Sequence, residues 1–212
     1  GAGASATSVG GLVGTAGASG VINYVKSMAG ITFNGAMRTG SGTKNSDGAS
    51  SGAGGSAWDF ALTGSGDMLG VDGLSWGAGY GVEEVDANGN TSADFDDNKH
   101  YTGFINYSMG PMTVGYQESQ IDNGGKGSTD ETTQQWGIAF AVNDDLSVSY
   151  GEREVEYSKP VADDVTEQGE GIAIAYTMGS MKIAGNTNEV SNNGGTAGTS
   201  DEMTEIALSF AF

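Results

Sequence analysis

Residues 205–212 read Glu-Ile-Ala-Leu-Ser-Phe-Ala-Phe, and they show the pattern that recurs through the chain most clearly. Its apolar side chains, at 206, 208, 210 and 212, alternate with small or polar ones. Successive side chains of a β-strand point to opposite sides, so a period of two indicates a strand with one apolar face. Segments 74–81, 135–142 and 171–178 repeat the pattern, with glycine, alanine or another small or polar residue at the alternate positions.

The same alternation, followed through the whole chain, predicts about eleven strands. They cover residues 21–28, 31–39, 58–66, 74–81, 101–109, 112–121, 135–142, 146–157, 171–178, 181–189 and 205–212. Tight links, such as 143–145 and 179–180, alternate with longer acidic or Gly/Asn-rich loops, such as 86–99 and 158–166. Outer-membrane barrels are built with short turns at one end and long loops at the other. The sequence therefore predicts an all-β, antiparallel, up-and-down transmembrane β-barrel.

The glycines favour a barrel with a polar interior. The chain holds 38 glycines and only 2 prolines, and Gly77, Gly79, Gly81 and Gly137 lie opposite the apolar face. In a packed sandwich that second face would be core, and glycine would leave it unfilled. Facing water, the same positions need only be small or polar. The alternative is a soluble or fibrous Gly-rich β protein.

Charge and cysteine content exclude several classes of function. The formal net charge is −19, from 8 Lys/Arg against 27 Asp/Glu, and such a chain repels nucleic-acid phosphates. The absence of cysteine excludes disulfides, thiolate zinc sites and a cysteine nucleophile. No apolar run approaches the ~20 residues of a transmembrane helix. The chain starts at Gly1 without a signal segment, so we expect a mature product or a fragment.

Two stretches resemble one family of membrane proteins. The closing strand, ending in Phe212, resembles the carboxy-terminal assembly signal of outer-membrane barrels. Residues 22–37, Ile-Asn-Tyr-Val-Lys-Ser-Met-Ala-Gly-Ile-Thr-Phe-Asn-Gly-Ala-Met, look like the hairpin that joins the sixth and seventh strands of alphaproteobacterial general diffusion porins. Those porins are trimeric and 16-stranded. Counting back from Phe212 as strand sixteen makes 31–39 strand seven, which agrees with the resemblance.

The resemblance implies a division of the chain and a missing part. Residues 21–212 would supply about eleven strands of a probable 16-stranded barrel, and strands one to five have no counterpart, so we expect a truncated chain. Residues 1–20 form a Gly/Ala/Ser-rich segment where the inward-folded constriction loop of such porins would end. This segment carries no charge, whereas porins of this kind usually place acidic residues on that loop.

Strand parity selects candidate pore-lining residues. The charged side chains on the inward face are Arg38, Asp59, Glu83, Arg153, Lys182 and Glu205. Polar neighbours on that face are Thr32, Asn34, Asn106, Gln135 and Asn186. Basic and acidic groups facing each other across a pore would set up a transverse field and order the water within it. The alternative is that these are ordinary solvated residues of the wall.

One acidic loop partly matches a calcium-binding pattern. Within residues 86–97, the candidate ligands for Ca²⁺ are Asp86, Asn88, Asn90, Asp94 and Asp97. Thr91 stands where an EF-hand needs glycine, and Asp97 where it needs glutamate. We expect at most loose divalent-cation binding, bridging to lipopolysaccharide phosphates, and the alternative is a solvated loop. No other cofactor is expected.

The sequence gives no basis for catalysis. The Gly-x-Ser-x-Gly match at 48–52 lies in a Gly/Ser tract with no helix after it, and His100 is the single histidine. Aromatic residues near strand ends or on the apolar face instead predict interfacial girdles. These are Tyr24, Trp58, Tyr80, Tyr101, Tyr107, Tyr116, Trp136, Tyr150 and Phe212.

The functional expectation is a passive, non-enzymatic diffusion channel of the bacterial outer membrane. It would pass small hydrophilic solutes with a modest cation preference arising from the acidic loops. Its partners would be outer-membrane lipid, lipopolysaccharide and two further copies in a homotrimer, with no nucleic acid. The alternative function is a Gly-rich acidic surface protein or adhesin that binds calcium.

Overall fold

The computed structural model describes residues 21–38, 54–85, 96–124 and 128–211. Eleven strands and two short 3₁₀ helices make up this part of the chain. The strands are β1 (Val21–Met28), β2 (Ile31–Arg38), β3 (Gly54–Ser65), β4 (Leu74–Val85), β5 (Asn98–Met109), β6 (Met112–Asp122), β7 (Asp130–Ala141), β8 (Leu146–Ser158), β9 (Val165–Met178), β10 (Met181–Ser191) and β11 (Ser200–Phe210). The helices are η1 (Gly66–Leu69) and η2 (Asn193–Gly195).

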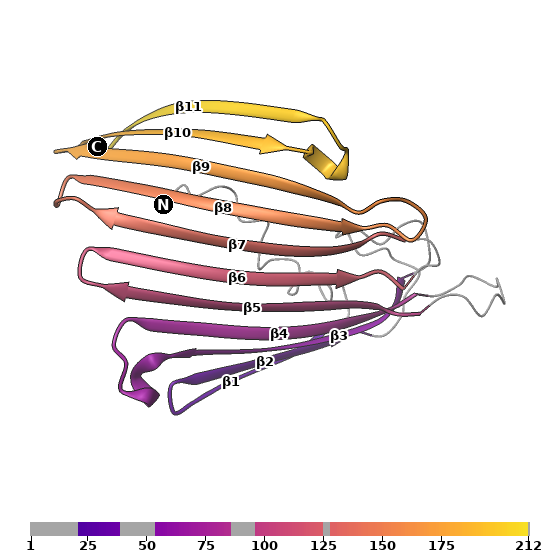
Figure 1. Ribbon diagram of the computed structural model, residues 1–212. Coiled ribbons are helices and arrows are strands. Elements are labelled where there is room, and N and C mark those ends of the chain that lie inside the picture. The colour runs from indigo at the N-terminus through magenta and orange to yellow at the C-terminus, as the bar shows by residue number, and fades with distance from the viewer. Residues whose placement is uncertain (1–20, 39–53, 86–95, 125–127, 212) are drawn as a thin grey trace.

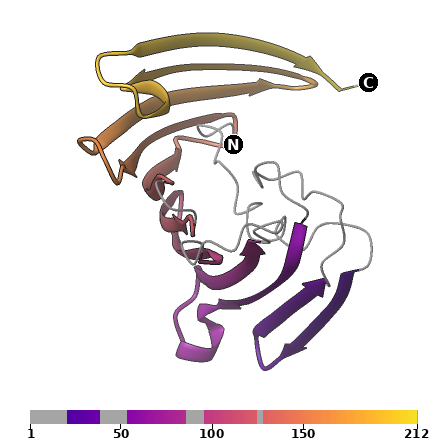
Figure 2. The same ribbon diagram turned by 90° about the vertical axis from the view of Figure 1, so that its right-hand side faces the viewer.

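All eleven strands form one sheet in chain order, and each antiparallel pair joins consecutive strands. Figure 1 shows the strands running side by side as a meander, with compact connections at one end and the longer ones at the other. We call these the turn end and the loop end. Within the described residues, β1 pairs only with β2 and β11 only with β10. Figure 2 shows that the sheet is curved into an open arc.

Local chemistry explains the tight turns. The two-residue loop Ala29–Gly30 has positive φ at both positions, 52° and 79°. This conformation matches the natural twist of a hairpin, and glycine adopts it without steric cost. The β3–β4 connection, also at the turn end, is longer and contains η1, where the Val71 N–H donates to the Gly66 carbonyl at 3.0 Å.

The described part of the sheet has no core of the kind found in soluble proteins. Among the described residues, the buried hydrophobic side chains are only those of Ala57, Val82 and Val155. Large apolar side chains are instead exposed, including Ile206 at 79% and Met28 at 73%. A continuous exposed apolar face of this extent is the mark of a surface that meets another apolar medium. No helix in the described part of the chain is long and apolar enough to span a membrane.

The predicted eleven-stranded up-and-down sheet is confirmed, but several strands are longer than the sequence indicates. β9 begins at Val165 instead of 171, and β11 begins at Ser200 instead of 205. The added residues are mostly polar, so the apolar alternation does not extend to them. Their backbone groups nevertheless continue the ladder, as in the pairs Glu189↔Glu202 and Glu189↔Glu170.

Candidate functional site

The strand register divides the side chains of the sheet into two sets. One level of the sheet runs through Gln117, Gln135, Arg153 and Gly169 on β6 to β9. The adjacent level runs through Tyr116, Trp136, Glu152 and Glu170. Side chains alternate sides along each strand, so these two levels face opposite ways. We call the first set, which includes most glycines and alanines, the inner face and the second the outer face.

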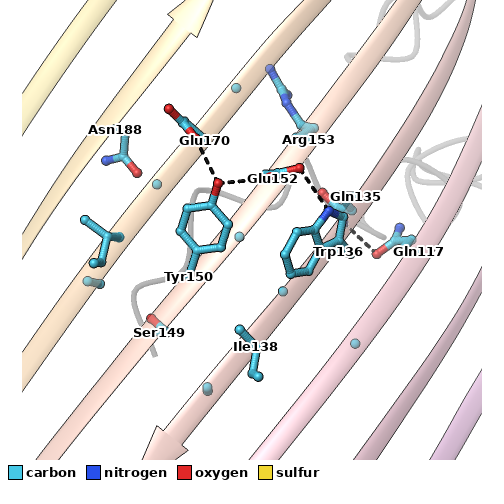
Figure 3. Close-up of a pocket in the computed structure, with 18 of the residues that line it drawn as sticks. Gln117, Gln135, Trp136, Ile138, Ser149, Tyr150, Glu152, Arg153, Glu170 and Asn188 are labelled. Atoms are coloured by element: carbon cyan, nitrogen blue, oxygen red, sulfur yellow. Dashed lines mark hydrogen bonds between the residues drawn. The ribbon is translucent and has the colours of Figure 1, made fainter.

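The inner face borders a cavity of about 1080 Å³ that extends from β3 to β11. Small residues such as Gly137, Gly151 and Ala173 leave this space open. Polar side chains also line it: the Gln135 amide donates to the Gln117 side chain at 3.0 Å, as Figure 3 shows. The wall is therefore hollowed, and it is built from small residues with polar side chains between them, as expected of a surface that meets water.

The register places the predicted charged residues on this inner face, but at different distances from its turn end and its loop end. Asp59 and Glu83 lie on β3 and β4 toward the loop end, and Lys182 lies at the turn end of β10. Glu205 on β11 pairs with Asn186, whose amide lies 3.4 Å from the Glu205 carboxylate. Arg38 is the last residue of β2 and has an inner-facing register position, but its side chain is not among those that the structure describes. That these residues line a pore stays a prediction.

Asp59 and His100 lie on either side of Gly81 on the inner face. Gly81 pairs with Asp59 on one side and His100 on the other, and it contributes no side chain between them. In the described part of the structure, Asp59 Oδ2 and His100 Nε2 are buried without a hydrogen-bond partner.

Glu167 is an inner-face acid that sequence reasoning missed. Its carboxylate forms an ion pair with Arg153, and the two side chains are 4% and 25% exposed. The pair joins adjacent strands, so it runs along the wall. The register also places Glu131 and Asp201 on the inner face. The signal that could have found Glu167 is its alternation with Gly169, Gly171 and Ala173, continued beyond the apolar segment.

The outer face carries an aromatic cluster that matches the predicted girdle. The rings of Trp58 and Tyr80 lie 5.4 Å apart, those of Tyr80 and Tyr101 4.9 Å, and those of Trp136 and Tyr150 5.6 Å. Tyr24, Tyr107 and Tyr116 lie on the same face, and Phe212 lies outside the described residues. Amphipathic rings at this position suit the boundary between hydrocarbon and water.

Carboxylates continue the outer face beyond the aromatic rings, toward the loop end. The Trp136 indole N–H donates to Glu152 at 3.1 Å, and the Tyr116 hydroxyl donates to Glu118 at 2.8 Å. The Tyr150 hydroxyl lies 2.6 Å from Glu152 and 2.8 Å from Glu170, as Figure 3 shows. A hydroxyl has one hydrogen, so Tyr150 donates to one of the two carboxylates at a time. The outer face thus changes from apolar to acidic along β6, β8 and β9.

The predicted calcium loop falls almost wholly outside the described residues. Asp86, Asn88, Asn90 and Asp94 lie there, and Asp97 is an exposed residue immediately before β5. Within the described ranges, no group of three or more His, Asp or Glu side chains is placed to hold a metal ion. Calcium binding by this loop stays a prediction.

A curved sheet of consecutively paired strands defines a transmembrane β-barrel protein when its outer face is apolar with aromatic rings at the boundary and its inner face is hollowed, with small and polar side chains. The particular family follows from the sequence match. The chain belongs to the Gram-negative porins, whose family model matches residues 1–211. The predicted membership of the porin family is confirmed. The protein belongs to the bacterial outer membrane.

Solved structures share the fold at low sequence identity. The anion-selective porin from Comamonas acidovorans is 13% identical, with a TM-score of 0.66 over 95% of this chain and 65% of its own. A porin refined at 1.8 Å resolution is also 13% identical, with a TM-score of 0.63 over 91% of this chain and 61% of its own. OmpT, an outer membrane protein of Vibrio cholerae, is 12% identical, with a TM-score of 0.59 over 90% of this chain and 63% of its own.

The chain thus spans less than two thirds of the length of these three structures. A search of curated proteins finds no match. None of these comparisons supports the alternative of a calcium-binding surface protein or adhesin.

Proposed function

We propose that the protein is a passive, non-enzymatic channel that lets small hydrophilic solutes diffuse across the outer membrane, with a modest preference for cations. The observation that carries the proposal is the contrast between the two faces of one sheet. The inner face is hollowed and carries small and polar side chains, whereas the outer face exposes large apolar side chains. Water and solutes would pass along the first while lipid covers the second.

The charges of the inner face support cation preference. Among the side chains that the structure describes, its acids are Asp59, Glu83, Glu131, Glu167, Asp201 and Glu205, and its bases are Arg153 and Lys182. Excess negative charge along a water-filled path concentrates cations within about a Debye length, ~8–10 Å at physiological salt. The Comamonas porin is described as anion-selective. Because ion selectivity depends on the side chains of the wall, a shared fold does not imply that this chain also prefers anions.

The outer face supports lipid and lipopolysaccharide as partners. Its apolar segment would contact the hydrocarbon, and the carboxylates beyond the aromatic rings would lie at the level of the headgroups. Divalent cations, which favour oxygen ligands, could bridge these carboxylates to lipopolysaccharide phosphates. We also propose a homotrimer, in which this sheet is part of a 16-stranded barrel of the alphaproteobacterial type. Among the described strands, β1 and β11 each pair on one side only, which is consistent with such a closure.

Planar-bilayer recording tests the proposed function. The protein purified from outer membranes with detergent is expected to form stable open channels, and a KCl gradient is expected to give a reversal potential favouring K⁺ at low salt. Absence of conductance would refute the channel, and a reversal potential favouring Cl⁻ would refute the cation preference alone. Liposome swelling with neutral sugars provides a second measure of diffusion that is independent of charge.

A further inference from the structure

The connection between β10 and β11, residues 192–199, is tied back onto neighbouring strands. The Gly194 N–H donates to Glu167 Oε2 at 2.7 Å, and the Lys159 ammonium donates to the Gly195 carbonyl at 2.8 Å. The Asn192 amide donates to the Thr166 carbonyl at 2.9 Å. Figure 1 shows η2 at the end of β10, and these bonds connect it to β9 and to the β8–β9 connection. We call this segment the terminal loop.

The terminal loop lies against the inner face. Tyr157 and Glu167 both occupy inner-facing register positions, on β8 and β9. Gly195 is buried, and an added Cβ there would lie 2.7 Å from two atoms of the Tyr157 ring. The φ of Gly195 is 68°, which also favours glycine. Shape and backbone conformation therefore both require glycine where the loop meets the wall.

The loop also holds its own shape. The Asn192 N–H donates to the Thr199 carbonyl at 2.6 Å, and the Gly198 N–H donates to the Asn192 side chain at 2.9 Å. The Thr199 hydroxyl donates to the Thr196 carbonyl at 2.7 Å. Bonds within the loop and bonds to the wall therefore hold it over inner-facing side chains of β8 and β9 at the loop end.

Glu167 is the junction of this arrangement. One carboxylate oxygen accepts from the Arg153 guanidinium, and the other accepts from the Gly194 N–H. A buried carboxylate is stable only where its charge is paired and its oxygens are hydrogen-bonded, and both conditions hold here. The same side chain thus fixes the loop and compensates a positive charge of the wall.

We propose that the terminal loop is a fixed constriction of the solute path at the loop end, and that Glu167 is the positioning residue that sets its width and charge. This inference rests on the proposed channel function. Arg153 and Glu167 then act together as a neutral pair that supports the loop. The acids elsewhere on the wall, which include Asp59 and Glu131, retain their effect on cations.

Cysteine modification tests whether the loop borders the path, since the chain contains no cysteine of its own. Thr196→Cys places an exposed thiol on the terminal loop, and Ala162→Cys places one on the exposed β8–β9 connection. A bulky thiol reagent is expected to reduce the single-channel conductance of the Thr196→Cys channel and to leave that of Ala162→Cys unchanged. Equal conductance of the Thr196→Cys channel before and after complete modification, confirmed by mass, overturns the inference.

A pair of charge variants tests the role of Glu167. Glu167→Gln keeps the shape but removes the charge that compensates Arg153, so the reversal potential is expected to shift toward anions. Glu154→Gln removes the same charge from the outer face of β8 and is expected to leave the reversal potential unchanged. Equal shifts in both variants, or none in either, contradict the role of Glu167. If the unmodified protein forms no channel at all, the proposed function fails and not merely this inference.

Discussion

Phe104 is an aromatic residue on the water-facing wall, and a glycine accommodates it. The register places Phe104 opposite Gly77 on the inner face, and a Cβ at Gly77 would overlap the Phe104 ring. Glycine in a strand lacks a side chain to pack, and a cross-strand aromatic ring that covers it makes up part of that loss. The Phe104 ring therefore occupies the space that a side chain at position 77 would need.

Gly77→Val is expected to destabilise the protein by about 1–3 kcal/mol, because the new side chain must displace the Phe104 ring. Gly103→Val is the matched control, since the nearest atom to an added Cβ there is 3.8 Å away. Urea titration in detergent micelles, followed by tryptophan fluorescence, measures both. Equal stability of the two variants would show that the Phe104 ring is not held over Gly77.

A positive charge on the outer face should cost far more than one on the inner face. Ile174 is 52% exposed on the outer face of β9, and its neighbour Ala175 faces inward beside Ser147 and Ala184. Ile174→Arg is expected to cost roughly 2–4 kcal/mol near the bilayer midplane. Ala175→Arg meets water and should cost much less. The free energy of unfolding in lipid vesicles decides between them, and equal costs would contradict the assignment of faces.

Sequence parity was sufficient to assign the face of a residue but not its partner. Lys182 and Glu205 fall on the inner face in the register, as the alternation of their strands indicates. The pairing of Arg153 with Glu167 was not predictable, because it depends on the register between two strands separated by an acidic connection. A period of two gives the orientation of each side chain, and only the ladder gives its cross-strand neighbour.

Several strands continue at the loop end beyond their apolar segment, which is the part that lipid would cover. The outer face of β8 is apolar at Val148 and Tyr150 and acidic at Glu152, Glu154 and Glu156. Hydropathy marks only the first part, so the sequence-based strand ends were wrong by several residues for β9 and β11. The fold-back of the terminal loop was likewise not predictable, because it depends on Gly195 meeting Tyr157 on another strand.

The direction of the strands can be tested from outside the cell. The β8–β9 connection lies at the loop end and the ordered turn at 142–145 lies at the turn end, where Asn143 accepts from two backbone N–H groups at 2.9 Å. An epitope inserted after Ala162 is expected to bind antibody on intact cells. One inserted after Asp144 should bind only after the outer membrane is permeabilised. The reverse pattern would invert the topology, and heat-modifiable electrophoretic migration controls for folding.

At the scale of the whole molecule, charge and apolar surface are separated by position. The net charge of −19 is carried on the inner wall, on the outer face near the loop end and in the connections, while the apolar segment of the outer face is nearly free of it. This separation follows from the two solvents that the sheet meets. It also explains why the sequence could predict a membrane protein. A soluble β fold would have to bury one face as a core, and neither face of this sheet suits that role.

The cation preference of the proposed channel should fade as salt rises. Water-exposed charges act over the Debye length, which falls from ~10 Å at 0.1 M salt to ~3 Å at 1 M. The ratio of K⁺ to Cl⁻ permeability, from reversal potentials, is therefore expected to be highest in dilute KCl and to approach the ratio of free mobilities at 1 M. A preference that stays constant over this range would indicate a narrow binding filter instead of a charged wall.

Because the described strands pair only with their neighbours in the chain, the sheet also limits how the number of strands can change during evolution. Gain or loss of one strand would reverse the direction of every later strand and transfer its connections to the opposite side of the membrane. Gain or loss of a two-strand hairpin leaves the direction, facing and connections of all the others unchanged. The hairpin is therefore the smallest heritable step by which such a sheet can widen or narrow. Lineages descended from one ancestral sheet are expected to differ in circumference by whole hairpins.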